Sequence, residues 1–311
     1  MAVNNSAIAI KQKSSKKNQK RFRDKLVPYA LLSPTAILLM VLMIIPIVMV
    51  IVYSFLARAI TNPDYSFVGF DNYQKVLSDP NFYGAIGHSL IFTVGSVLAH
   101  LVLGMSFALL LNSKYLNRHF ATVMRALFIV PWVFTIAVVA VLWRMILNPN
   151  GVLNSILETL GVISSSVEWL AEPTLALAVL TLVNIWAGYP FFMVSLLAGL
   201  QGLPTDLYEA ARIDRVGSVR AFRHITIPLL KPIIISLMLL DFIWTSQQFP
   251  LIWLMTGGGP VRSTEVAPTY IYKLAFSEYQ FAVASAAAVI VLLLSMIMAI
   301  FYVRHQRRAS K

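Results

Sequence analysis

Six long apolar stretches constrain this sequence more than any other feature. Each is long enough to cross a bilayer, because a hydrocarbon core of about 30 Å needs about 20 helical residues. Stretches this long with few or no charged residues favour helices, which satisfy their own backbone hydrogen bonds in lipid, and none shows the alternation of a membrane barrel strand. We therefore expect an all-α polytopic membrane protein with six transmembrane helices, at residues 27–57, 89–111, 126–147, 174–200, 233–255 and 281–303.

The composition and the placement of charge agree with this interpretation. Hydrophobic residues make up 58% of the chain and charged residues 12%, whereas soluble domains are about half apolar and a quarter charged. Of the 25 lysines and arginines, 20 lie in residues 1–26, 112–125, 201–232 and 304–311. With six spans these four regions share one side of the membrane, and the positive-inside rule makes that side, with both termini, cytoplasmic. Topology therefore accounts for the net charge of +12, and we expect no nucleic-acid partner.

The predicted domain organisation is a basic N-terminal tail (1–25), a six-helix transmembrane domain (26–303) and a basic C-terminal tail (304–311). The first apolar stretch is too long for a removable signal peptide and is expected to remain as the first span. The sequence contains no cysteine, which excludes disulfides and thiol catalysis. The GxxxxGK[ST], HExxH and GxSxG motifs are also absent. We therefore expect no enzyme activity and no metal site, so if the chain performs energised work, the energy must come from another chain or an ion gradient.

The segment between the fourth and fifth apolar stretches is highly charged for this chain. Pro204 followed by Thr205 predicts a helix start with Thr205 as its cap. Gly217 can take the left-handed conformation that ends a helix, and Ser218 can cap a second one. The loop at 205–228 is therefore expected to form two short cytoplasmic helices with small alanines exposed on one side. Its arginines also suit an amphipathic helix lying on lipid headgroups.

The same loop contains Glu209-Ala210-Ala211, followed by Ile225, Ile227 and Pro228. In these residues it resembles the EAA loop of bacterial ABC import permeases. The flanking sequence is similar to the carbohydrate uptake branch, which includes the maltose-type and glycerol-3-phosphate-type permeases. Residues 184–190 and the outer TGGGP segment, with Gly258, Gly259 and Pro260, carry the same resemblance. Where the family usually has a glycine this chain has Arg215, and we expect the bend to shift to Gly217.

The resemblance implies a type I ABC importer permease fold whose EAA loop docks into a cleft on an ATPase subunit. It implies a second homologous permease, a dimer of ATP-binding subunits and an extracytoplasmic solute-binding protein, all at the bacterial inner membrane. ATP and magnesium would bind to the partner ATPase, so this chain needs no cofactor. The residues assigned to coupling are Glu209, Ala210, Ala211, Asp214, Arg215, Gly217, Ile225 and Pro228.

Polar residues inside the apolar stretches are candidates for substrate contacts, because they are costly in a membrane unless they face a cavity or a partner. Maltose-type permeases line their sugar site from matching positions of two helices. The resemblance therefore assigns Asn184, Gly188, Phe191, Asp241, Thr245 and Gln248 to substrate binding. The alternative is that the uncharged members bond between helices and that Asp241 pairs with a cation on the partner subunit. Trp186, Tyr189, Trp244 and Trp253 are interpreted as packing or interfacial anchors.

The predicted function is uptake of an oligosaccharide, monosaccharide or polyol by alternating access, with this chain as one permease subunit. Glycerol phosphate is the runner-up, although neither substrate helix offers a cation to its phosphate. A gradient-driven secondary transporter, with Asp241 as a proton carrier, and a purely structural membrane subunit remain as alternatives. Secondary transporters usually contain two related halves, and this sequence shows no internal repeat.

Overall fold

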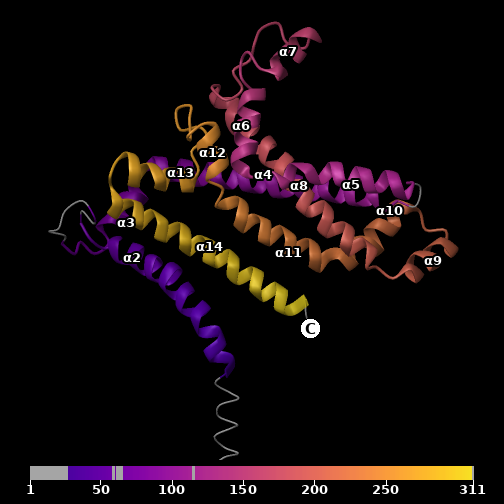
Figure 1. Cartoon of the computed structure of the whole chain (residues 1–311), viewed down its shortest axis with the longest axis horizontal. Helices are drawn as coiled ribbons and strands as arrows, with labels where there is room; N and C mark the ends of the chain where they lie inside the picture. The colour runs from indigo at the N-terminus through magenta and orange to yellow at the C-terminus, as the bar shows by residue number, and fades with distance from the viewer. Residues whose placement is uncertain (1–26, 58–59, 61–65, 114–115, 310–311) are drawn as a thin grey trace, which may run out of the picture. The chain divides into compact units, whose positions relative to one another are not determined.

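The computed structural model describes residues 27–57, 60, 66–113 and 116–309, so the predicted tail at 1–25 lies outside the described residues. Within those ranges the secondary structure is helical, apart from one isolated bridge between Leu56 and Phe67. This confirms the all-α prediction. The chain divides into two units, one ending at Tyr53 and one beginning at Ser54, and Figure 1 shows the helices of each.

The first unit is one apolar helix, Val27–Tyr53. It contains a π-helical turn, η1 (Met40–Ile44), directly before α2 (Ile45–Tyr53). Pro46 accounts for the irregular turn, because proline lacks the N–H that would bond to the preceding turn. None of its residues is buried, as expected for a helix whose apolar side chains point outward on every side.

The second unit is built around two long helices, α4 (Pro80–Leu111) and α8 (Pro173–Gln201), which form the most extensive helix pair in it. Both α5 (Arg118–Val133) and α11 (Ile227–Ser246) pack against this pair, and α14 (Phe281–Ala309) packs against α11 (Figure 1). The shorter elements are α3 (Asp71–Ser78), α6 (Ile136–Ile146), α7 (Val152–Thr159), α9 (Thr205–Ile213), α10 (Ser218–Ala221), η2 (Phe222–Thr226), α12 (Pro250–Met255), α13 (Ala267–Tyr272) and η3 (Lys273–Ser277).

Gly104 lets α4 approach α8 closely. A Cβ atom at this position would lie 2.4 Å from the Phe192 Cβ and 2.9 Å from the Met193 backbone nitrogen. Phe192 and Met193 are fully buried, in a cluster that also includes Leu196 and Leu230. Without a hydrophobic driving force between helices in lipid, such close packing through small residues is a main source of helix association.

The number of membrane spans matches the six predicted if the bent helix pair α5–α6 is counted as one span. Some of the spans differ in shape from the prediction. By length and composition, five described helices can cross a membrane, and the bent pair α5–α6 makes a sixth if it counts as one span. The sequence predicted a continuous span at 126–147, whereas the chain turns by 95° between α5 and α6. Phe134 and Thr135 are extended at the break. The turn brings Val139 and Ala140 into a buried cluster with Leu251 on α12, a gain in packing that a hydropathy pattern cannot show.

The second and fifth spans also differ from their predicted bounds. Helix α4 begins at Pro80 rather than 89, with the Asp79 side chain accepting from the Asn81 N–H at 2.9 Å. The predicted span at 233–255 is interrupted after Ser246 and resumes as α12 at Pro250. Pro250 cannot donate to the Ser246 carbonyl, which favours a break there.

The packing at Gly104 gives a stability prediction. Gly104→Ala should lower the free energy of unfolding by about 1–3 kcal/mol, because the added methyl forces α4 and α8 apart. Thermal unfolding of the detergent-purified protein measures the change. Gly84→Ala and Gly87→Ala are matched controls on α4, since a Cβ at either position meets nothing within 4 Å. Equal melting temperatures for Gly104→Ala and these controls would contradict the packing argument.

Candidate functional site

Polar side chains from α4, α8 and α11 meet inside the transmembrane bundle. His100 Nδ1 lies 2.8 Å from an Asp241 carboxylate oxygen, and His100 Nε2 lies 3.1 Å from the Asn184 carbonyl oxygen. The Thr245 hydroxyl donates to the other Asp241 oxygen at 3.2 Å. All four residues are buried. The structure therefore pairs Asp241 with His100 within its own chain.

Gly188 provides the room for the His100 ring. A Cβ atom at this position would lie 2.4 Å from His100 Nε2 and 2.5 Å from Cε1. The sequence interpretation placed Gly188 among the substrate contacts, and here its missing side chain accommodates the imidazole. His100 itself was missed, although a histidine inside an apolar stretch is a rare polar residue and is a signal for function.

The Asn184 side chain joins the same group through Gln248. The Gln248 Nε2 atom donates to Asn184 Oδ1 at 3.5 Å. Asn184 Nδ2 is buried without a hydrogen-bond partner in the described part of the chain, as are the hydroxyls of Thr93 and Ser96 on α4. Because buried polar groups are nearly always paired, these groups are available to water or to the hydroxyls of a ligand.

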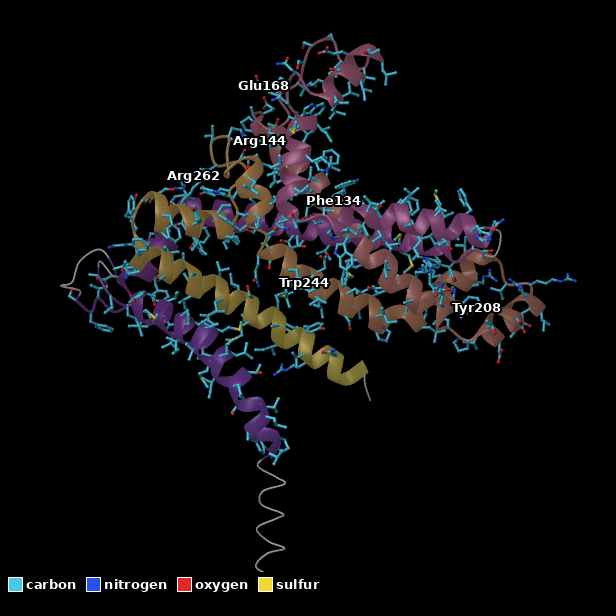
Figure 2. The ribbon with its side chains drawn as sticks, in the orientation of Figure 1. Phe134, Arg144, Glu168, Tyr208, Trp244 and Arg262 are labelled. Carbon is cyan, nitrogen blue, oxygen red and sulfur yellow. The ribbon has the colours of Figure 1, made fainter. Side chains whose placement is uncertain are left out.

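The aromatic member of the predicted set, Phe191, lies in a separate group of rings. Its centroid is 6.2 Å from that of Trp132 and 5.5 Å from that of Trp244. Trp132 and Trp244 are 53% and 56% exposed. Figure 2 labels Trp244 on α11. Sequence reasoning missed Trp132 and interpreted Trp244 as a packing or interfacial anchor, and its ring packs against Phe191 while remaining exposed.

The other three aromatic residues interpreted as anchors are packed within the chain. Trp186 contacts Trp143 edge to face, with centroids 5.5 Å apart. The buried Tyr189 donates its hydroxyl to the Phe128 carbonyl at 3.1 Å, and the Trp253 ring stacks on Phe249. Their contacts are therefore structural.

The EAA-like loop forms α9 and α10, but its caps differ from those expected. Thr205 is the first residue of α9 and Ser218 the first of α10, so Pro204 and Gly217 occupy the capping positions, without side-chain cap bonds. A hydroxyl already inside the first turn cannot reach the free N–H groups that a cap residue serves. The Tyr208 and Thr226 hydroxyls lie 2.9 Å apart and tie α9 to η2.

Arg215, not Gly217, forms the bend between the two helices. Arg215 has a φ of 53°, whereas Gly217 has a φ of −65°. The Arg215 N–H donates to Arg212 and the Val216 N–H to Ala211, at 3.0 and 2.8 Å. These two bonds define a Schellman motif, which requires a left-handed residue at this position. The expected shift of the bend to Gly217 was therefore wrong, because the hydrogen bonds fix its place.

Most of the residues assigned to coupling are exposed. Ala211 is buried, which corrects the expectation that both alanines face outward, and Ile225 is half-buried. Two apolar side chains, Ile213 and Val219, are each 82% exposed at the bend. The coupling residues that are exposed are Glu209, Ala210, Asp214, Arg215, Gly217 and Pro228.

The TGGGP segment forms an ordered turn on the side opposite the EAA-like loop. Gly257 and Gly258 have φ values of 60° and 86°, and the peptide between Gly259 and Pro260 is cis. A Cβ at Gly258 would lie 3.0 Å from Lys273 Nζ and 3.4 Å from the Glu265 Cα. Glycine is needed here both for its conformation and for the close approach of these side chains.

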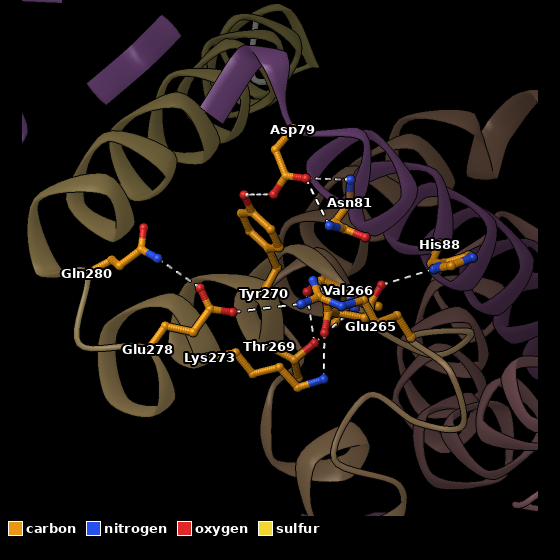
Figure 3. A network of polar contacts seen from close by, with 11 residues as sticks. Asp79, Asn81, His88, Glu265, Val266, Thr269, Tyr270, Lys273, Glu278 and Gln280 are labelled. Carbon is orange, nitrogen blue, oxygen red and sulfur yellow. Dashed lines mark hydrogen bonds and ion pairs between the residues drawn. The ribbon is translucent and has the colours of Figure 1, made fainter. Parts of the chain in front are cut away.

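A buried carboxylate stabilises this turn and was not found from the sequence. Glu265 is fully buried and lies 3.0 Å from Arg262 Nη1 and 2.5 Å from Lys273 Nζ. His88 Nδ1 lies 3.1 Å from the Glu265 carbonyl oxygen and joins the turn to α4. Figure 3 shows the network. Arg262, Glu265 and Lys273 follow the TGGGP segment in the sequence and belong to no motif. Their ion pairs are therefore visible only in the folded structure.

The same network includes a tyrosine with a perturbed phenol. Tyr270 donates its hydroxyl to Asp79 at 2.7 Å (Figure 3). Burial and the bond to Asp79 raise the pKa of Tyr270 above its usual range. The phenol therefore stays protonated at neutral pH and keeps α13 attached to the start of α4.

The bend at Arg215 gives a second prediction. Arg215→Gly should stabilise the EAA-like loop by about 1 kcal/mol, because a left-handed conformation is costly for a residue with a Cβ. Hydrogen exchange of the α9 amides measures the gain. Gly217→Ala is the matched control, since Gly217 has a negative φ and open space around it, and its effect should be much smaller. Faster exchange in Arg215→Gly would show that the arginine side chain itself stabilises the bend.

The buried carboxylate gives a third prediction. Glu265→Gln should lower the free energy of unfolding by about 1–3 kcal/mol, because it leaves Lys273 without its counter-charge and Arg262 with only Glu278. Glu278→Gln is the control. Glu278 lies 3.7 Å from Arg262 with a side chain 37% exposed, and such surface pairs contribute about 0–1 kcal/mol. Similar melting temperatures for the two variants would contradict the structural role of Glu265.

Comparison with known proteins identifies the family. The family model described as the inner membrane component of binding-protein-dependent transport systems matches residues 100–311. The trehalose/maltose transport system permease protein of Thermococcus litoralis is 35% identical over 289 residues, which cover 91% of this chain and 95% of the relative. The sulfoquinovosyl glycerol transport system permease protein of Agrobacterium fabrum is 33% identical over 283 residues, covering 90% of each.

A solved structure agrees with the fold. A chain of a bacterial ABC transporter involved in the import of the acidic polysaccharide alginate superposes with a TM-score of 0.81 at 24% identity, covering 95% of this chain and 100% of that one. The protein therefore belongs to the inner membrane components of binding-protein-dependent transport systems, and it has the fold of a type I ABC importer permease.

Proposed function

We propose that this chain is the permease subunit of an ATP-driven importer that takes up an uncharged sugar by alternating access. The observation that carries the proposal is the gathering of buried amide and hydroxyl groups within the membrane spans, on a bundle that also presents the exposed rings of Trp132 and Trp244 beside Phe191. Relatives whose names state a substrate transport trehalose and maltose or sulfoquinovosyl glycerol, which supports a sugar as the class.

The site chemistry suits a saccharide. Sugar hydroxyls both donate and accept, and Asn184, Thr245 and Gln248 offer groups of both kinds. The ring faces of Phe191, Trp132 and Trp244 suit the apolar faces of a pyranose, because aromatic surfaces combine large apolar contact with defined geometry. The unpartnered Asn184 Nδ2 is a donor that a sugar hydroxyl would satisfy.

The charge of the site favours an uncharged substrate. The Asp241 carboxylate is engaged by His100 and Thr245. No lysine or arginine side chain bonds to the site residues in the described part of the chain. A phosphate, sulfonate or uronate would enter without a counter-charge, at a high cost in a low-dielectric setting. Glycerol phosphate is therefore disfavoured.

The EAA-like loop is the proposed contact with the ATPase. The exposed apolar side chains of Ile213 and Val219 lie among charged, exposed neighbours such as Glu209 and Arg215, and interfaces commonly combine an apolar centre with a polar rim. Since α10 and η2 lead directly into α11, a movement of the loop would be transmitted along the helix that carries Asp241 and Thr245. The Schellman bend would make the two short helices a stiff lever.

The remaining assignments complete the importer. ATP and magnesium would be held by a dimer of ATP-binding subunits, and this chain would itself hold no cofactor. A second, homologous permease would supply the other half of the pathway, and a solute-binding protein would deliver the sugar to the face of the TGGGP turn. The termini would lie in the cytoplasm, on the side of the basic loops.

The assembly can be tested by purifying the tagged chain from its native membrane in mild detergent and identifying what comes with it by mass spectrometry. We expect a Walker-A ATPase and a second permease with an EAA loop. The ATPase activity of the complex, with its binding protein, should rise with trehalose or maltose and not with sulfoquinovosyl glycerol or an alginate oligosaccharide. Recovery of the chain alone, stable and without ATPase, would instead favour gradient-driven transport with Asp241 as the first residue to titrate.

The aromatic rings give a specific prediction for this assay. Trp244→Ala should raise the half-saturating sugar concentration about tenfold, because a stacking contact of about 1.4 kcal/mol is lost. Assembly with the ATPase should persist. Leu182→Ala is the control, since Leu182 is an aliphatic residue of similar exposure, 63%, on α8. An unchanged half-saturating concentration in Trp244→Ala would remove the rings from the substrate site.

A further inference from the structure

His100 has acceptors on both sides of its ring. The Asn184 carbonyl oxygen, 3.1 Å from Nε2, can only accept, so Nε2 must carry a proton to bond with it. The Asp241 oxygen lies 2.8 Å from Nδ1. A bare nitrogen facing an ionised carboxylate at this distance would be repelled, so a second proton must lie between them, on Nδ1 or on the carboxyl group. Either arrangement gives the pair two protons and no net charge.

We infer that His100 and Asp241 form a neutral pair, and that His100 is a positioning residue that fixes where Asn184 of α8 lies in the substrate site. The positioning role rests on the proposed function, which assigns this polar site to sugar binding. The pair joins α4 to α11 through Asp241 and to α8 through the backbone of Asn184, whose side chain bonds to Gln248. One imidazole thus sets the relative register of the three helices that carry the polar sugar contacts.

The neighbouring residues are arranged for this role. Gly188 leaves room for the ring, since a Cβ there would overlap it. Phe192 packs against the imidazole with centroids 5.9 Å apart, and the Thr245 hydroxyl satisfies the second Asp241 oxygen. The side-chain exposure of His100 is 2%. Because the ring is packed and hydrogen-bonded, it holds Asn184 and Asp241 in fixed positions. Supporting residues around a binding site orient the binding groups in the same way.

No other charge compensates the pair within the described residues. Other titratable or charged side chains lie on the helices that pack around the pair. Among the described residues, none of them bonds to His100 or Asp241. They are Tyr83 and His88 on α4, Tyr189 on α8, Lys231 on α11, His119 and Arg125 on α5, and Tyr302 and Arg304 on α14. The neutrality of the site therefore depends on the two protons of the pair.

The protonation can be read directly. The purified complex, labelled with ¹⁵N-histidine, should show one histidine whose Nε2 carries a proton at neutral pH and whose signals disappear in His100→Gln. Infrared difference spectra against Asp241→Asn should show either a protonated carboxyl or a carboxylate facing a doubly protonated ring. A His100 with a bare Nε2 and an ionised Asp241 would overturn the neutral pair.

The positioning role is tested by a mutant cycle in the same complex. His100→Ala leaves a buried carboxylate unpaired and should lower the melting temperature by about 5 °C. The double variant His100→Ala with Asp241→Ala should recover part of this loss, because removing both partners leaves no buried charge. His100→Gln, whose amide nitrogen can donate to one of the two acceptors, should be less damaging than His100→Ala. A double variant less stable than either single variant would contradict the pairing.

A second readout separates positioning from simple stability. His100→Ala should raise the half-saturating trehalose concentration for ATPase stimulation about tenfold, with a much smaller change in maximal rate. Gly188→Ala should act in the same direction, because it displaces the ring. His88→Ala is the matched control on α4, since His88 contacts the outer turn. An unchanged half-saturating concentration in His100→Ala would overturn the positioning role.

These outcomes keep the inference distinct from the proposed function. If the wild-type complex responds to trehalose but His100→Ala responds equally well, the inference fails and the sugar importer stands. If no sugar stimulates the wild-type complex, the proposed substrate class fails, and the spectra and the thermal cycle still decide whether the neutral pair exists.

Discussion

The close approach of α4 to α8 is the contact on which the rest of the second unit depends. In lipid, helices gain little from burying apolar surface against each other, so they associate where small residues let their backbones meet. Gly104 allows this at Phe192, and Gly188 allows His100 to enter between the helices. The polar cluster with Asn184 and Asp241 can form only because this packing holds the three helices close enough for direct hydrogen bonds.

The helix class and the positions of most spans could be predicted from the sequence, because long apolar runs leave a chain in lipid with few alternatives. The 95° bend before α6 could not, since the apolar run at 126–147 continues through the break and the packing of α6 against α12 appears only in the fold. The gathering of Asn184, Asp241, Thr245 and Gln248 was predicted in part, from helical spacing and resemblance. His100 was missed because its partners come from other helices.

The EAA-like loop shows how local rules and tertiary structure compete. Glycine preference placed the bend at Gly217, yet the hydrogen bonds that close α9 require the left-handed residue at Arg215. Arg215 thus takes the left-handed conformation at the position where the family usually has glycine. Its backbone is strained as a result. On the opposite side, Glu265 holds the TGGGP turn through ion pairs that no motif reveals. Both loops are held by specific hydrogen bonds or ion pairs, and the polar and aromatic site lies on helices between them.

The central claim, that this site lines a substrate pathway opened from outside the chain, can be tested by cysteine accessibility. The natural sequence has no cysteine, so Gln248→Cys and Trp244→Cys introduce unique thiols, with Leu182→Cys as a lipid-facing control. In the native complex, a membrane-impermeant maleimide added from the outer face should label both site positions in the ATP-bound state and spare them in the nucleotide-free state. Resistance of both positions in every nucleotide state would contradict the account.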